Sequence, residues 1–345
     1  MTAEAPSTAR PSGFRSRLGD PVSMAAWVVV ATLGATLIAK SLRHHGYVFD
    51  MAANFAAHFA WLAALCAIAC LIARRWTAAA ALVVIALVHV GWLAGGRAAA
   101  DRSGDGPAIS VLHFNARTTN PTPERVVDLI DLVNADLVTM VEVPDRAIDL
   151  IRDSAKMRER YPYQSTPAHP DERNNIRLSK HPFEVLDLVD RSDPADARRY
   201  VLGHTAVVDH PAGRFVHTMI IPISPRSPAK WAEGNASFRD DLWALSKRMG
   251  PRTVPWIIGI DMNGAPGSVR ADQARAAAGV VRAKPLGLVA GTWPSWLPGP
   301  VRIAIDDLVV TEDVRVRSWR VVPGSFGSDH QPIEVVVTIA GDHNR

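Results

Sequence analysis

Three apolar stretches near the amino terminus constrain this chain more than any other feature. They run from Pro21 to Ala39, from Met51 to Ala73 and from Thr77 to Gly96. Each is close to the roughly 20 residues that a helix needs to cross a bilayer core. A soluble helical bundle would show polar faces, which these stretches lack. A cleaved signal peptide would account for the first stretch alone. The sequence therefore predicts a three-span transmembrane region over residues 21–96.

Basic residues around these stretches predict an orientation. If the amino terminus is cytoplasmic, five of them lie inside and three outside, namely Arg10, Arg15, Arg17, Arg74 and Arg75 against Lys40, Arg43 and Arg97. This bias follows the positive-inside rule. We therefore expect a multi-pass membrane protein, with the lipid bilayer as partner, a cytoplasmic amino terminus and everything after Gly96 extracytoplasmic. Residues 1–20 are rich in Pro, Ser, Thr and Arg and predict a disordered arm.

The remainder of the chain has the composition of an ordinary globular domain. Residues 97–107 predict a linker, and residues 108–345 a single α/β domain in which strand and helix signals alternate. A helix start is predicted at Thr122-Pro123-Glu124, and an amphipathic helix over Ser237–Met249. The expected strands are Ile109–Phe114, Asp136–Val143, Thr205–Val208, Phe215–Ile221, the apolar run Val254–Ile258, Val301–Val310, Arg315–Val322 and Ile333–Ile339.

Polar residues mark the ends of several of these strands. Asp261 and Asn263 follow the apolar run that begins at Val254, and the others are Asn115, Glu142, His217, Asp306 and the pair Asp329-His330. Each has a structural explanation, such as a turn that caps its own backbone or a histidine satisfied in the core. Jointly these explanations are hard to sustain, because acids within apolar runs are costly unless they are paired or metal-bound.

The same residues give the chain a family resemblance. The sequence from Ile109 to Ile339 resembles the endonuclease/exonuclease/phosphatase (EEP) superfamily of Mg²⁺-dependent phosphoesterases. The matching motifs, in the expected order, are the strand ending in Asn115, Leu137–Glu142, His217-Thr218, Gly259–Gly264, Ile305-Asp306 and Ser328-Asp329-His330-x-Pro332. Ile260, Met262 and Asp307 depart from the family pattern. The resemblance implies a DNase I-like, four-layered α/β sandwich with two mixed β-sheets, preceded here by three transmembrane helices.

The resemblance also implies a role for each motif residue. Glu142, Asn115 and Asp329 would bind the metal, Mg²⁺ with Mn²⁺ as the alternative, which takes oxygen ligands. Asp261 would orient and deprotonate the attacking water, and Asn263 would donate a hydrogen bond to a phosphoryl oxygen. His330 and His217 would contact the phosphoryl group, with Asp306 holding the tautomer of His330.

Two features bear on the substrate. The predicted extracytoplasmic location and the absence of a dense basic stripe with interleaved aromatics make nucleic acid a less expected partner. The layout resembles membrane-tethered bacterial members of the superfamily that include a glycopeptide-resistance type, whose expected substrates are lipid-linked phosphates. We therefore expect hydrolysis of a phosphoester or phosphoanhydride on a membrane-associated substrate. The alternatives are a nuclease of the same superfamily and a non-catalytic, membrane-anchored binding protein on the same fold.

Overall fold

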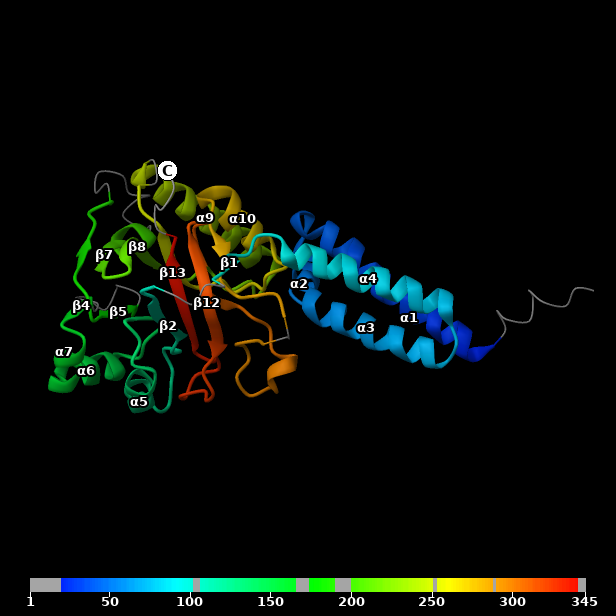
Figure 1. The fold of residues 1–345 in the computed structure, drawn as a ribbon, viewed down its shortest axis with the longest axis horizontal. Coiled ribbons are helices and arrows are strands. Elements are labelled where there is room, and N and C mark those ends of the chain that lie inside the picture. The colour runs from blue at the N-terminus through cyan, green and yellow to red at the C-terminus, as the bar shows by residue number, and fades with distance from the viewer. Residues whose placement is uncertain are drawn as a thin grey trace, which may run out of the picture.

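The computed structural model describes residues 20–101, 106–165, 174–189, 200–250, 253–287 and 290–340. An elongated N-terminal helical region projects from one side of a larger α/β domain (Figure 1). The predicted disordered arm, except Asp20, lies outside the described residues, as do positions 102–105 of the predicted linker. Residues 99–100 of that linker form a short strand on the α/β domain, so this part of it is docked rather than free.

The helical region contains α1, α3 and α4 packed together, with the short α2 between them and the α/β domain (Figure 1). Their bounds are α1 Pro21–Ser41, η1 Arg43–His45, α2 Tyr47–Ala53, α3 Ala56–Ile72 and α4 Trp76–Ala94. Small residues such as Ala63 and Ala79 are buried where the helices meet, while large apolar residues such as Leu65 and Leu87 face outward. Outward-facing apolar side chains over whole helices are what a lipid environment accommodates.

The prediction of three continuous spans is only partly correct. Helices α1 and α4 are long and apolar enough to cross a membrane, but the second stretch forms two helices, α2 and α3, which meet at a 58° bend. A third span exists only if this bent pair counts as one. The helix also begins at Tyr47, before the predicted Met51. The bend has a physical cause, because Asp50 and Asn54 are bonded to the α/β domain rather than placed along a straight apolar helix.

The α/β domain has the predicted four layers, with two mixed sheets packed face to face. The first sheet has the order β1-β12-β13-β2-β3-β5-β4 and the second β10-β11-β9-β8-β7-β6. The strands are β1 Ala99–Ala100, β2 Ile109–Asn115, β3 Leu137–Val141, β4 Tyr163–Ser165, β5 Ile176–Ser179, β6 Phe183–Val185, β7 Ala206–His210, β8 Gly213–Ile220, β9 Trp256–Asp261, β10 Val281–Arg282, β11 Asp306–Val310, β12 Val314–Val321 and β13 Ile333–Ile339. Alternating side chains such as Val111, Phe215 and Val335 fill the space between the sheets.

Helices cover the outer face of each sheet. The first sheet packs against α5 Glu124–Val133, α6 Asp145–Asp153 and α7 Ala155–Arg160, and the second against α8 Tyr200–Gly203, α9 Pro228–Met249 and α10 Val269–Ala278. A short 3₁₀ turn, η3 Gly299–Val301, precedes β11. The predicted strand Val301–Val310 is therefore shorter than expected. Helix α9 is longer than predicted, and α5 begins at Glu124 without a side-chain cap from Thr122.

Candidate active site

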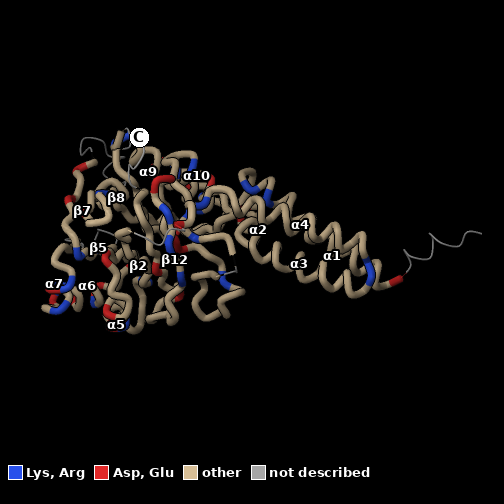
Figure 2. The backbone as a smooth tube through the Cα atoms, in the orientation of Figure 1, with Lys and Arg blue, Asp and Glu red and all other residues tan. Residues whose placement is uncertain are grey.

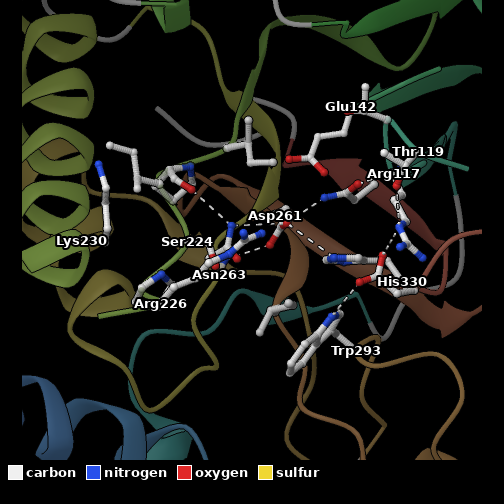
Figure 3. Close-up of a pocket in the computed structure, with 18 of the residues that line it drawn as sticks. Arg117, Thr119, Glu142, Ser224, Arg226, Lys230, Asp261, Asn263, Trp293 and His330 are labelled. Carbon is white, nitrogen blue, oxygen red and sulfur yellow. Dashed lines mark hydrogen bonds and ion pairs between the residues drawn. The ribbon is translucent and has the colours of Figure 1, made fainter. Parts of the chain in front are cut away.

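Polar side chains from both sheets meet at one end of the sandwich. Strands β2 and β3 are parallel, so Asn115 at the end of one lies beside the residue before Glu142 at the end of the other. In the second sheet, Asp306 at the start of β11 pairs in register with Asp261 at the end of β9. The strand ends open into a cavity of about 1270 Å³ lined by Asn115, Glu142, Asp261, Asn263, Asp329 and His330 among others (Figure 3). Six of the eight predicted site residues therefore line one cavity.

Asp261 lies at the centre of this cavity wall. Its Oδ1 accepts a hydrogen bond from the backbone N–H of Asn263 at 2.9 Å, and its Oδ2 accepts one from Nδ2 of Asn115 at 2.9 Å. The first of these bonds is the self-capping turn that the sequence also allowed, so the turn is both a cap and part of the site. Asn263 has a left-handed backbone (φ 47°), and its Nδ2 donates to the carbonyl of Pro222.

His330 connects Asp261 with Asp306. Its Nδ1 lies 2.9 Å from Oδ2 of Asp306, and its Nε2 lies 3.9 Å from Oδ2 of Asp261. Burial disfavours the imidazolium, but the charges of Asp306 and Asp261 outweigh it and raise the pKa of His330 to about 10. Burial opposes ionisation of Asp306 too, yet the charge and hydrogen bond of His330 hold its pKa below the ordinary value. The predicted pairing of Asp306 with His330 is thus present, and it favours a charged imidazolium at neutral pH.

Burial also acts on Asp261. Desolvation, followed by repulsion from Asp306, raises the pKa of Asp261 to about 7, against the attraction of His330. A carboxyl group with a pKa near neutrality is suited to accept and release a proton during a reaction. Asp261, Asp306 and His330 are termed here the catalytic group. Asp261 can act as a base near neutral pH, and Asp306 holds His330 as an imidazolium.

The donor set beside this group fits a hard divalent cation. Glu142 lines the cavity on the side of Asn115, and no hydrogen bond or ion pair to another described residue engages its carboxylate (Figure 3). Its backbone is left-handed (φ 52°), a strained conformation for Glu, and its N–H donates to Oδ1 of Asn175. Such strain persists where the surroundings hold a side chain in place. An available carboxylate beside amide and acidic oxygens is the ligand chemistry that Mg²⁺ prefers.

Asp329 stands at the rim of the same cavity. Its Oδ2 accepts a hydrogen bond from Nε1 of Trp293 at 3.3 Å, and its Oδ1 lies 3.8 Å from Nε of Arg117. Its side chain is about one-third exposed. It is therefore open to solvent, unlike the fully buried Asp306, and can contribute oxygen to a ligand in the cavity without losing these contacts.

His217 is not brought to the cavity. His217 lies within β8, as in the predicted strand Phe215–Ile221, and is fully buried between the sheets. Its Nδ1 accepts a hydrogen bond from Nε of Arg177 at 2.8 Å. Burial and the Arg177 charge lower its pKa well below the ordinary value. This placement argues against the predicted contact with a phosphoryl group and favours the core-histidine interpretation; residues 221–226 line the cavity instead.

Asp307, which the family pattern left uninterpreted, has a structural role. It points to the opposite face of β11 from Asp306. Its Oδ2 lies 2.8 Å from Nε of Arg282 in a buried ion pair, and its Oδ1 accepts a hydrogen bond from Nε1 of Trp319 at 2.9 Å. Arg282 in turn donates a hydrogen bond to the carbonyl of Gly264, the last residue of the turn Asp261–Gly264, termed here the catalytic turn. Asp307, which departs from the family pattern, therefore holds Arg282 against the catalytic turn.

Several cavity residues were missed from the sequence. They are Met51, Asn54, Arg117, Asn175, Arg226 and Lys230. Asn175 precedes β5, which is antiparallel to β3, so its amino end meets the carboxyl end of β3. Looking for polar residues at both ends of each strand would have found Asn175. No local pattern placed Met51 and Asn54, which come from the helical region, in the site.

A second group with similar residue types lies elsewhere. Asp136, His181 and His210, termed here the distal group, bring potential ligand atoms within 4.8 Å of one another. However, Nδ1 of His210 accepts a hydrogen bond from the N–H of Ala212 at 2.9 Å. The neutral ring then carries its proton on Nε2, which faces Asp136 at 3.9 Å and has no free lone pair for a metal. This group fits a hydrogen-bonded cluster rather than an ion site.

The fold and the strand-end residues define a hydrolase with the DNase I-like sandwich. Residues 112–330 match the model of the Endonuclease/Exonuclease/phosphatase family, and the chain belongs to this family. Its members hydrolyse phosphoester bonds and typically use divalent metals. Asn115, Asp261, Asp306 and His330 all fall within the matched residues.

Solved structures with similar folds come from several organisms. They include an endonuclease/exonuclease/phosphatase from Beutenbergia cavernae DSM 12333, with 20% identity, 68% coverage of this chain, 72% of that chain and a TM-score of 0.49. D. rerio TDP2 complexed with single-strand DNA product shows 13% identity, coverages of 68% and 100%, and a TM-score of 0.50. Sphingomyelinase C from Streptomyces griseocarneus shows 16% identity, with 67% coverage of this chain, 99% of that chain and a TM-score of 0.47. At these identities the likeness concerns the fold alone. No curated protein matches the sequence.

Proposed function

We propose that this protein is a membrane-anchored, Mg²⁺-dependent phosphoesterase that hydrolyses a phosphate ester or anhydride on a lipid-linked, extracytoplasmic substrate. The observation that carries the proposal is the shared cavity. The catalytic turn and His330 line it together with Met51 and Asn54 from the apolar helical region. A site built partly from the helices that would sit in or against a bilayer is suited to a substrate held there.

The residues supply the reaction with a base, a cation and hydrogen-bond donors. Asp261 would take the proton of the attacking water, since its pKa of about 7 places it close to ambient pH. The His330 imidazolium would donate to a phosphoryl oxygen, and Asp306 would keep its Nδ1 protonated. Asn263 would donate to another phosphoryl oxygen. Glu142, with Asn115 and Asp329, would hold Mg²⁺, which neutralises phosphate charge and steadies the leaving oxygen when bound.

The charge distribution supports helices that cross a membrane. Lysine, arginine and acidic residues appear at the two ends of the helical region and are sparse along its middle (Figure 2). Asp20 pairs with Arg75 at the end far from the α/β domain, and Lys40 and Arg43 contact the domain at the other. With Arg74 and Arg75 on the cytoplasmic side, the α/β domain would be extracytoplasmic. A reporter fused after Arg345 tests this, and activity of a cytoplasmic reporter would contradict it.

The direct test is a phosphate-release panel on lipid phosphates, lipid diphosphates, bis(p-nitrophenyl) phosphate and DNA. The full-length protein in phospholipid vesicles, supplied with Mg²⁺, is compared with Glu142→Gln and with Glu184→Gln as a matched control on the exposed strand β6. We expect hydrolysis of a lipid substrate that Glu142→Gln loses and Glu184→Gln retains. Cleavage of DNA in preference to lipid would favour the nuclease alternative. Failure on every substrate would favour a binding protein.

A further inference from the structure

Helix α2 is built into the α/β domain by buried polar contacts. Oδ1 of Asp50 accepts a hydrogen bond from the N–H of Val269 at 2.8 Å, and its Oδ2 accepts one from Nε1 of Trp231 at 2.8 Å. Oδ1 of Asn54 accepts a hydrogen bond from the N–H of Ala265 at 2.6 Å, and Ala265 lies two residues after Asn263. Both side chains are buried. Because an unpaired buried carboxylate is costly, these bonds fix α2 against the segment that follows the catalytic turn.

The opposite side of α2 is apolar and exposed. Val48 is 72% exposed and Phe49 37%, and Phe55, directly before α3, is 43% exposed. One face of this short helix is therefore bonded to the α/β domain, while its other side exposes apolar side chains, as α3 does. A helix that is polar toward a protein domain and apolar outward is typical of the bilayer interface.

Met51 lies between these two faces. It lines the cavity that holds Asp261 and His330. On a helix, residues three apart are neighbours, so Met51 adjoins the exposed Val48. The two side chains form an apolar strip from the outer surface of the helical region to the cavity. Further apolar side chains line the same cavity, namely Ile221, Ile223, Trp293, Ile303 and Ile305.

We propose that the strip at Met51 binds the hydrocarbon chain of the substrate while its phosphate lies at Asp261 and His330. This inference rests on the proposed function and adds a specificity-determining residue to it. The cavity joins a charged, hydrogen-bonding centre to an apolar wall that includes Met51, and Met51 adjoins the exposed apolar side chain of Val48. An amphiphile with its phosphate in the centre can then keep its chain in contact with apolar surface throughout. A small soluble phosphate ester would gain nothing from Met51.

The test compares two substrates in three variants of the full-length protein in phospholipid vesicles with Mg²⁺. The substrates are a long-chain alkyl phosphate ester embedded in the vesicle and a water-soluble nitrophenyl phosphate ester. For Met51→Ser we expect kcat/KM on the embedded substrate to fall about tenfold. This corresponds to the lower end of the free energy gained by burying a Met side chain. The soluble ester should change by less than about twofold, and Met51→Leu should restore lipid hydrolysis because it conserves volume.

Leu65→Ser is the matched control, since Leu65 is an exposed apolar residue of the helical region, on α3, and neither belongs to the strip nor lines the cavity. We expect it to retain kcat/KM on both substrates. An equal loss in Leu65→Ser would show an effect of bilayer insertion and overturn the inference. So would an equal loss on both substrates in Met51→Ser, or no loss on either. The proposed function fails separately, if the wild type hydrolyses the soluble ester but not the embedded one.

Discussion

The two ends of β3 show how similar residues acquire different roles. Directly before β3, Asp136 belongs to the distal group with His181 and His210; directly after it, Glu142 faces the cavity of the catalytic group. Each group brings carboxylate and imidazole atoms within 4.8 Å of one another. Residue types and proximity are therefore alike, and the differences lie in the second carboxylate of the catalytic group and in the surroundings.

Those surroundings act on the two aspartates in opposite directions. Partial burial opposes ionisation of Asp136, but the nearby His210, the bonds from Ser110 and the charge of Lys180 together hold its pKa below the ordinary value. Ser110 alone donates through its hydroxyl at 2.6 Å and its N–H at 3.0 Å. Asp261 is fully buried next to a second carboxylate, and its pKa is raised. A satisfied carboxylate stabilises the fold, whereas a perturbed one in a cavity is available for chemistry.

The largest expected effect is on activity. Asp261→Asn keeps the shape of the side chain and an acceptor for the N–H of Asn263, but removes the proposed base, so we expect kcat to fall about 10³- to 10⁴-fold. The measurement is hydrolysis of the soluble nitrophenyl ester. Asp136→Asn, the matched change in the distal group, should stay within about threefold of wild type. Similar losses in both variants would break the distinction between the groups.

The neighbouring pair Asp306 and Asp307 extends the comparison to one strand. Asp307→Asn leaves Arg282 buried without its countercharge, and we expect a loss of about 3–5 kcal/mol in the free energy of unfolding. Urea unfolding of the full-length protein in detergent measures it. Arg214→Ala breaks an exposed ion pair with Asp209 and should cost about 1 kcal/mol or less. Equal losses would mean that Asp307 does not fasten the catalytic turn.

Part of this arrangement could be predicted from the sequence. Alternating strand and helix signals predicted an α/β domain, and the strand-end polar residues predicted most of the cavity, because the pattern of a strand and its last residue are local properties. The two-sheet sandwich was predicted by the family resemblance. His217 was assigned a phosphoryl contact that its buried position does not provide, because the sequence of a strand does not show whether a histidine in it faces the cavity or the opposite sheet. The bend after Ala53 and the entry of Met51 into the cavity depend on bonds to residues more than 180 positions away. Such contacts leave no local pattern.

The pKa of His330 tests the catalytic group directly. In the metal-free protein we expect its imidazole to stay protonated up to about pH 10, since Asp306 and Asp261 stabilise the cation. Because this folded-state pKa exceeds the ordinary value of 6.5, the stabilisation is complete below pH 6.5 and lost as the pH rises through 10. Asp306→Asn should move the pKa toward 6.5. NMR titration of the His330 ring measures this pKa in the wild type and in Asp306→Asn. A wild-type midpoint near pH 6.5 would contradict the positive charge assigned to His330 at neutral pH.

The smallest expected effect concerns the distal group. Its contribution to stability is lost as the pH falls, whereas that of His330 is lost as the pH rises. The pKa of Asp136 is depressed, so its carboxylate stabilises the fold above its unfolded-state pKa of about 3.8, and this contribution is lost as the pH falls below that value. We expect Asp136→Asn to cost about 1–3 kcal/mol at pH 7 through weakened bonds to Ser110, and less at pH 3. Urea unfolding at the two pH values measures the difference, with Asp209→Asn as a control on an exposed ion pair. If the cost of Asp136→Asn were the same at both pH values, the charge of Asp136 would not matter, and the contrast with Asp261 would rest on access to the cavity alone.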